Sequence, residues 1–104
     1  MKLWIDDVRP APEGYIWVKT VNQAKKYIDG FETPINKEFF GEIELIDCDH
    51  DLGDYASDGG DGIKLLDWLE ETGRNYPIRI HSMNPVGVAN MRAIIEKNGW
   101  KEIR

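Results

Sequence analysis

The sequence predicts a single three-layer α/β/α domain, with a mostly parallel five-stranded sheet and helices on both of its faces. Short apolar runs alternate with stretches of helical period along a chain of only 104 residues. Strands separated by helices in this way imply right-handed crossovers between parallel strands. A chain of this length buries one modest core, so one domain over residues 1–104 is expected.

Five short apolar runs bounded by turn residues predict the strands. They cover residues 2–5, 15–18, 43–46, 78–80 and 100–104. Three of these runs are followed by polar segments, which are Asp6-Asp7, Asp49-His50-Asp51 at the end of Asp47-Cys48-Asp49-His50-Asp51, and His81-Ser82. Ligands of such sheets bind beyond the carboxyl ends of the strands, so these polar side chains are expected to converge.

Apolar residues at helical spacing predict three helices. They are expected over residues 21–28, from Ile63 to the stop signal Thr72-Gly73, and from about Val86 to Lys97. Thr20 is a suitable N-cap for the first helix, and Gly30 is its expected stop. Residues 31–41 mix proline and phenylalanine with charged residues and show no clear period, which predicts a loop or irregular turn.

Composition excludes several classes of partner. The formal net charge is −6 and no basic stripe is visible, which argues against an extended nucleic-acid-binding surface. No apolar run is long enough for a membrane span, so no membrane partner is expected. Cys48 is the only cysteine, which excludes an internal disulfide and fits a reducing compartment. We therefore expect a cytoplasmic protein that binds a small molecule, a cation or another protein.

The acidic residues at the strand ends predict a site for a divalent cation. Several carboxylates stay ionised together only when a cation or hydrogen-bond donors compensate their repulsion. Oxygen ligands favour Mg²⁺ or Mn²⁺, and Asp6, Asp7 and Asp49 are the predicted ligands. Asp51 either joins them or orients His50. Each acidic pair taken alone is equally typical of ordinary turn chemistry.

The same residues resemble those of a response-regulator receiver domain, which has a flavodoxin-like fold. Receivers place paired acids after the first strand, a phospho-accepting aspartate after the third and Ser or Thr after the fourth, as do Asp6-Asp7, Asp49 and Ser82 here. The segment between the first two strands, residues 8–14, is too short and proline-rich for the receiver's first helix, and no residues follow Arg104 to form the last. The usual lysine has no clear counterpart, because Lys101 lies at the start of its strand.

A closer resemblance is to cyclic-phosphate-processing receiver-like domains, which are small bacterial and phage proteins. It is carried by three signatures: Asp6-Asp7-Val8-Arg9, Cys48-Asp49-His50-Asp51-Leu52-Gly53 with cysteine where leucine is usual, and His81-Ser82-Met83-Asn84-Pro85. The resemblance implies a role in processing a 2',3'-cyclic phosphate or a related phosphodiester, including RNA ends.

The residue types suit this chemistry, which needs a base, an acid and donors to the phosphate oxygens. His50 and His81, the only histidines, are predicted to be catalytic together with Asp49 and Asp51, one histidine acting as base and the other as acid. Arg9, Ser82 and Asn84 are predicted to bind phosphate. Each histidine is also typical of a hydrogen-bonded strand end, and Arg9 is equally suited to an ion pair with Asp6 or Asp7.

Other functions stay open from the residues alone. The alternative to an enzyme is a signalling or interaction module that accepts a phosphoryl group on Asp49 or docks to a partner. A third reading is an antitoxin-like or phage inhibitor protein whose acidic surface binds a basic partner. The absence of the two receiver helices would expose apolar surface of the sheet. A second copy of the chain could cover this surface, so a homodimer is one of the expected assemblies. An EF-hand is disfavoured because Leu52 occupies the position that needs glycine.

Overall fold

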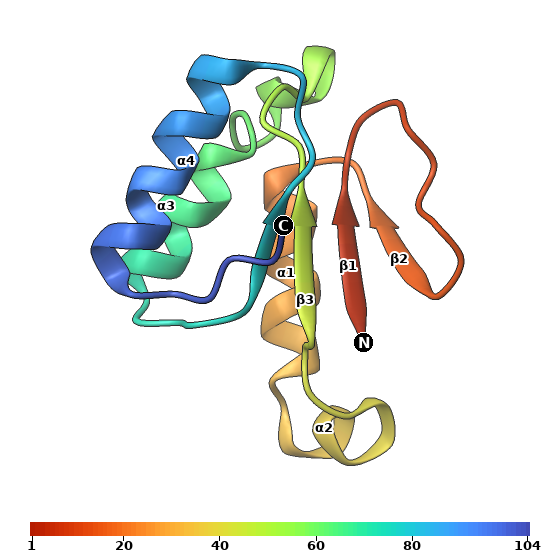
Figure 1. Ribbon diagram of the computed structural model, residues 1–104. Coiled ribbons are helices and arrows are strands. Elements are labelled where there is room, and N and C mark those ends of the chain that lie inside the picture. The colour runs from red at the N-terminus through yellow and green to blue at the C-terminus, as the bar shows by residue number, and fades with distance from the viewer.

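A parallel sheet of four strands forms the centre of the computed structural model, which describes all residues 1–104. The strands are β1 (Lys2–Ile5), β2 (Tyr15–Val18), β3 (Leu45–Cys48) and β4 (Ile78–Ile80), in the order β2-β1-β3-β4 (Figure 1). The prediction of a parallel α/β sheet is therefore confirmed. The sheet order reverses between β1 and β3, which are neighbours in the sheet.

The predicted fifth strand is wrong, because residues 100–104 make only one isolated bridge, between Glu102 and Ile78. Ile78 donates its N–H to the carbonyl of Lys101 and accepts the N–H of Ile103. The neighbouring strand β4 has only three residues, so it offers little edge along which the chain could continue to pair.

Four α-helices and one 3₁₀ turn complete the fold: α1 (Val21–Phe31), α2 (Pro34–Phe40), η1 (Gly53–Ser57), α3 (Ile63–Glu71) and α4 (Pro85–Asn98). Thr20 caps α1 as predicted, since its side chain accepts the N–H of Gln23. Gly99 ends α4 with a left-handed backbone conformation. Gly30 does not stop α1, which continues through it to Phe31. No helix is long and apolar enough to cross a membrane.

The helix α2 lies where an irregular segment was predicted. Thr33 accepts the N–H of Asn36, and Pro34 occupies the first turn, so the usual signals for a helix start are present. None of the residues of α2 is buried, and a helix with no buried face has no apolar period to detect. The prediction failed because it relied on periodicity rather than on the capping signal.

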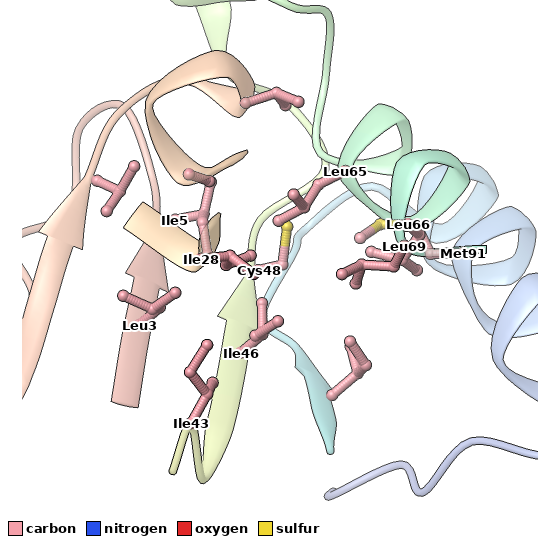
Figure 2. Packing of buried hydrophobic residues seen from close by; sticks show 14 of the residues in the cluster. Leu3, Ile5, Ile28, Ile43, Ile46, Cys48, Leu65, Leu66, Leu69 and Met91 are labelled. Carbon is pink, nitrogen blue, oxygen red and sulfur yellow. The ribbon is translucent and has the colours of Figure 1, made fainter. Parts of the chain in front are cut away.

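All three long helices pack on one face of the sheet, which corrects the three-layer prediction. The core joins strand residues such as Leu3, Ile46 and Ile78 to residues of α1, α3 and α4 in one cluster (Figure 2). Right-handed crossovers place helices on opposite faces when the chain moves in opposite directions across a sheet. The steps from β2 to β3 and from β3 to β4 run the same way, and the reverse step from β1 to β2 contains no helix.

On the face of the sheet that no helix covers, one row of side chains across the four strands contains two tryptophans and two charged residues. Trp17, Trp4, Asp47 and Arg79 are register partners on β2, β1, β3 and β4. Trp4 is 8% exposed and Asp47 is fully buried, although no helix lies over them. The ring of His81, which stacks on Trp4 and contacts Asp47, covers part of this row and connects it to the polar ends of the strands.

Away from the strand ends, a group of polar side chains connects the end of α1 to the loop after α3. Arg74 donates to both carboxylate oxygens of Glu32, and the hydroxyl of Tyr76 donates to the same carboxylate. The hydrogen bonds from Arg74 hold the pKa of Glu32 below its ordinary value of 4.5, against the opposing effect of burial. A lowered folded-state pKa contributes stability above the unfolded value, and this contribution is lost as the pH falls through the folded value.

The substitution Glu32→Gln is therefore expected to lower the free energy of unfolding at pH 7 by about 1 kcal/mol. The difference from the unmodified protein should shrink toward zero as the pH is lowered below 4.5. Urea unfolding across this pH range measures it. Glu38→Gln, at an exposed position of α2 without a partner, is the matched control. A pH-independent loss of stability in Glu32→Gln would contradict the linkage.

Candidate functional site

Two buried carboxylates lie on either side of the point where the strand order reverses. Asp6 directly follows β1 and is 1% exposed, and Asp49 directly follows β3 and is 7% exposed. The N–H of Asp49 donates to the carbonyl of Ile5, so the ends of the two strands are held in register. Ligands of open parallel sheets bind at this position.

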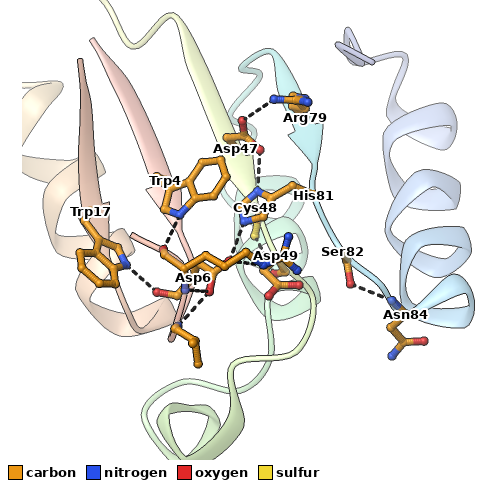
Figure 3. A network of polar contacts seen from close by, with 12 residues as sticks. Trp4, Asp6, Trp17, Asp47, Cys48, Asp49, Arg79, His81, Ser82 and Asn84 are labelled. Atoms are coloured by element: carbon orange, nitrogen blue, oxygen red, sulfur yellow. Dashed lines mark hydrogen bonds and ion pairs between the residues drawn. The ribbon is translucent and has the colours of Figure 1, made fainter. Parts of the chain in front are cut away.

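The local chain geometry fixes the carboxylate of Asp6. Its Oδ1 accepts the backbone N–H groups of Val8, at 2.9 Å, and Arg9, at 2.8 Å. Its Oδ2 lies 2.9 Å from Nε2 of His81 (Figure 3). Burial alone would raise the pKa of Asp6, but these two N–H groups and the His81 ring outweigh it and lower the pKa. The carboxylate is therefore held ionised at the strand end.

The imidazole of His81 joins two carboxylates from different strands. Its Nδ1 lies 2.6 Å from Oδ1 of Asp47, while its Nε2 faces Asp6. Only the doubly protonated ring carries an N–H for each carboxylate. The ring also stacks on the indole of Trp4, with centroids 3.7 Å apart and planes 7° from parallel. Arg79, whose side chain is half-exposed, reaches the other oxygen of Asp47 at 3.3 Å and completes an ionic network around this buried carboxylate.

His81 is held in place by Asp47 and Trp4, to which the sequence motifs assign no role. Asp47 lies inside a strand whose other three residues are apolar, and all four positions of that strand are buried. A charged residue at a fully buried strand position needs a partner of opposite charge or several donors. That placement within an apolar strand is the signal in the sequence that marks Asp47.

The carboxylate of Asp49 differs from that of Asp6 in its electrostatics. Burial raises the pKa of Asp49, and the neighbouring charge of Asp6 raises it further, against the lowering effect of the Ser82 hydroxyl and His81. Burial likewise raises the pKa of the Cys48 thiol, which keeps it protonated in the core. The repulsion between Asp6 and Asp49 marks the position where added positive charge would be stabilising.

The donor set at this position fits a hard divalent cation. Asp6 and Asp49 each offer a carboxylate oxygen, and these oxygens lie within 4.8 Å of each other and of a ring nitrogen of His81. Both ring nitrogens of His81 already face carboxylates, so the two aspartates are the candidate ligands. Carboxylate oxygens are the preferred ligands of Mg²⁺ and Mn²⁺. The third predicted ligand, Asp7, lies outside this group, and its Oδ2 would be 2.6 Å from a Cβ placed on Gly53.

A second cluster contains the other histidine. Nδ1 of His50 lies 2.7 Å from Oδ1 of Asp51, and the side-chain amide of Asn84 donates to both oxygens of Asp51. These hydrogen bonds lower the pKa of Asp51, with the His50 contact as the largest cause. Asp61 also lies within ligand distance of this pair. Asp51 thus orients His50, which was one of the two roles predicted for it from the sequence.

Nε2 of His50 makes no hydrogen bond, and no buried side-chain nitrogen or oxygen lacks a partner, so this nitrogen reaches solvent. The ring packs on Gly87 in the first turn of α4, where a Cβ would lie 2.5 Å from the imidazole. A side chain at position 87 would therefore displace the ring. The sequence analysis did not identify Gly87 as part of the site.

The predicted phosphate-binding residues connect the two clusters. The hydroxyl of Ser82 accepts the N–H of Asn84 at 3.2 Å, and Oδ1 of Asn84 caps α4 at Gly87. Both ends of the Asn84 amide therefore already have partners. Nε of Arg9 lies 3.7 Å from Oδ2 of Asp6, which is the ion pair that the sequence offered as the alternative to a phosphate clamp. Its side chain is 49% exposed and remains accessible to a ligand.

The clusters lie on an open edge of the molecule and not in a deep cavity. The two hollows of the surface are elsewhere: one of about 290 Å³ borders Tyr27 and Phe31, and one of about 540 Å³ borders the start of α1. Neither is lined by a residue of the two clusters. An open edge of this kind admits the end of a larger molecule as readily as a small one.

Comparison with known proteins gives one match. The sequence matches the family model described as the cyclic-phosphate processing Receiver domain over residues 1–97 of 104. The match includes all the residues of both clusters. No curated protein and no solved structure matches the chain.

Proposed function

The chain belongs to the cyclic-phosphate processing receiver domain family, and we propose that the two clusters at its strand ends open the ring of a terminal cyclic phosphodiester such as a 2',3'-cyclic phosphate. The observation that carries the proposal is the state of His50. One ring nitrogen is held by Asp51 and the other is free at the edge that also bears two buried carboxylates. An imidazole held in this way is suited to proton transfer near neutral pH.

The reaction needs one water molecule for each ring that is opened. Water adds to phosphorus, one ring P–O bond breaks, and the product is a phosphate monoester beside a freed hydroxyl. Nε2 of His50 takes the proton from the attacking water, and the departing oxygen receives a proton from solvent. Arg9 and Ser82 donate to the charged phosphate oxygens. In this scheme both nitrogens of His81 stay bound to carboxylates, so His81 positions Asp6 and does not transfer the proton.

Asp6 and Asp49 would hold a divalent cation, Mg²⁺ or Mn²⁺, with Asp7 as a further candidate ligand. When bound, the cation would supply positive charge to the phosphate oxygens. The proton of the attacking water is taken up by protein side chains. His50 and Asp51 move the proton, and the side-chain amide of Asn84 keeps Asp51 in place. This division of roles follows from which polar atoms already have partners.

Phosphoryl transfer to Asp49 is the rival function, and one observation weighs against it. Lys101 accepts a hydrogen bond from Ile78, the first residue of β4, and so lies at the end of the sheet away from Asp49. The lysine that receivers use beside their acceptor aspartate therefore has no equivalent in Lys101. A signalling or docking role without chemistry would require neither the free nitrogen of His50 nor its contact with Asp51.

The test is incubation of the protein with Mg²⁺ and adenosine 2',3'-cyclic phosphate, followed by ³¹P NMR. We expect conversion to a monoester, and we expect EDTA to reduce the rate by more than about 100-fold until Mg²⁺ or Mn²⁺ is restored. Asp49→Asn should reproduce the effect of EDTA, while Asp67→Asn on the surface of α3 should not. A stable acyl phosphate formed from acetyl phosphate, without ring opening, would favour the receiver function instead.

A further inference from the structure

We propose that Trp17 and Tyr55 form a subsite for a planar nucleobase beside the two clusters, so that the substrate is a nucleoside or an RNA end. This inference rests on the proposed function, because it names the part of the substrate that the cyclic phosphate is attached to. The side chains of Trp17, Lys19 and Tyr55 lie together and form what we call the aromatic slot.

The two rings of the aromatic slot face the same point. The ammonium of Lys19 lies over the ring of Trp17, 4.6 Å from its centroid, and over the ring of Tyr55, 5.7 Å from its centroid. Trp17 belongs to β2 and Tyr55 to η1, so segments distant in sequence bring the rings together. The space that both rings face is occupied by the end of a flexible side chain, which a ligand displaces easily.

The aromatic slot adjoins the proposed reaction centre. Nε1 of Trp17 donates to the carbonyl of Asp6 at 2.8 Å, and the carboxylate of that same residue lies in the centre (Figure 3). Gly53, the first residue of η1, lies against the carboxylate of Asp7. The ring of Trp17 is thus held to Asp6, and the turn that carries Tyr55 begins against Asp7. The separation between base and phosphate in a nucleoside cyclic phosphate is one ribose ring, which suits adjacent subsites.

The ring of Trp17 can stack on a base, whereas the ring of Trp4 is already stacked on another side chain. Trp4 is the register partner of Trp17 on β1, but one of its faces stacks on His81 and its ring makes a T-shaped contact with Tyr15. Trp17 is held by its indole N–H, makes no aromatic pair, and has the ammonium of Lys19 over its ring. Tyr55 is 43% exposed. Stacking of a base on an aromatic ring is stronger than an exposed cation–π contact, so exchange of Lys19 for a base is favourable.

The experiment compares a substrate that has a base with one that lacks it. The unmodified protein should process adenosine 2',3'-cyclic phosphate with a higher kcat/KM than the 2',3'-cyclic phosphate of methyl riboside. Tyr55→Ala should lower kcat/KM for the adenosine compound about 5- to 150-fold and leave the base-free compound unchanged. Tyr55→Phe should restore the difference, since it keeps the ring. Equal losses on both compounds, or no loss on either, would overturn the subsite.

Tyr27→Ala is the matched control, because Tyr27 is exposed to a similar degree, 38%, on α1 away from the aromatic slot. It should leave the ratio of the two kcat/KM values unchanged.

Failure of the proposed function is distinguished by a binding measurement that needs no turnover. If neither cyclic phosphate is processed, calorimetry with adenosine 3'-monophosphate and methyl riboside 3-phosphate tests the aromatic slot directly. Tighter binding of the adenosine compound, reduced in Tyr55→Ala but not in Tyr27→Ala, would support the subsite while the catalytic proposal falls. Equal affinity for the two compounds would overturn the subsite.

Discussion

His50→Ala is expected to reduce kcat for the opening of adenosine 2',3'-cyclic phosphate about 10²- to 10⁴-fold, the range typical of a lost general base. The reason is that His50 alone combines a ring nitrogen held by a carboxylate with a second nitrogen that reaches solvent. KM should change little, because His50 takes a proton and does not anchor the phosphate. Initial rates measured by ³¹P NMR or chromatography with Mg²⁺ present provide the test.

Two further variants separate proton transfer from structural support. His50→Gln retains a side-chain amide near Asp51 but has no titrating nitrogen, so it should be as slow as His50→Ala. Asp51→Asn keeps the imidazole and should lose less activity than either. All three variants should unfold within a few degrees of the unmodified protein. Substantial activity in His50→Gln would contradict the assignment of His50 as base.

His81→Leu is expected to lower the free energy of unfolding by about 3 kcal/mol, because it removes the ring that contacts two buried carboxylates. Asp6 and Asp47 are 1% and 0% exposed, and His81 contacts both. Leucine fills part of the space against Trp4 but offers no N–H group. Urea denaturation at pH 7 measures the change, and Arg79→Ala is the control, since that side chain is 47% exposed and should cost less than about 1 kcal/mol.

A double-mutant cycle tests whether the loss arises from the ionic contact. Asp47→Asn alone should destabilise the protein, because it weakens a contact of 2.6 Å to Nδ1 of His81. In the His81→Leu background the same substitution should be neutral or stabilising, since it removes an uncompensated buried charge. The expected coupling free energy is about 1–3 kcal/mol. Additive effects would show that His81 contributes packing alone.

The sequence predicted the strands best where an apolar run is short and ends abruptly. Residues 2–5, 15–18 and 78–80 were predicted with the bounds that the structure has. The third strand begins two residues later than predicted, at Leu45, and extends through Asp47 to Cys48. It was misplaced because a buried aspartate reads as the end of a strand until its partner His81 is known. That partner lies 34 residues away in the sequence.

The number of layers required information that local patterns do not contain. In a three-layer fold, helices bury both faces of a strand. When aromatic side chains bury the face that lacks helices, the strand has a similar sequence, so the number of layers cannot be read from it. Here Trp4 and Leu45 are buried although they point away from the helices. The opposite holds for α2, where apolar residues such as Ile35 and Phe39 are exposed and do not belong to the core.

The motifs of the sequence established the family and the edge of the sheet at which the polar residues lie, since strand ends and their polar side chains are local features of the chain. The partners of each polar atom depended on three-dimensional packing. Asp6 meets His81 and Asp51 meets Asn84 across separations of 75 and 33 residues. Distances of this kind are set by strand order and by how closely glycines such as Gly87 let side chains approach, and no local pattern encodes them.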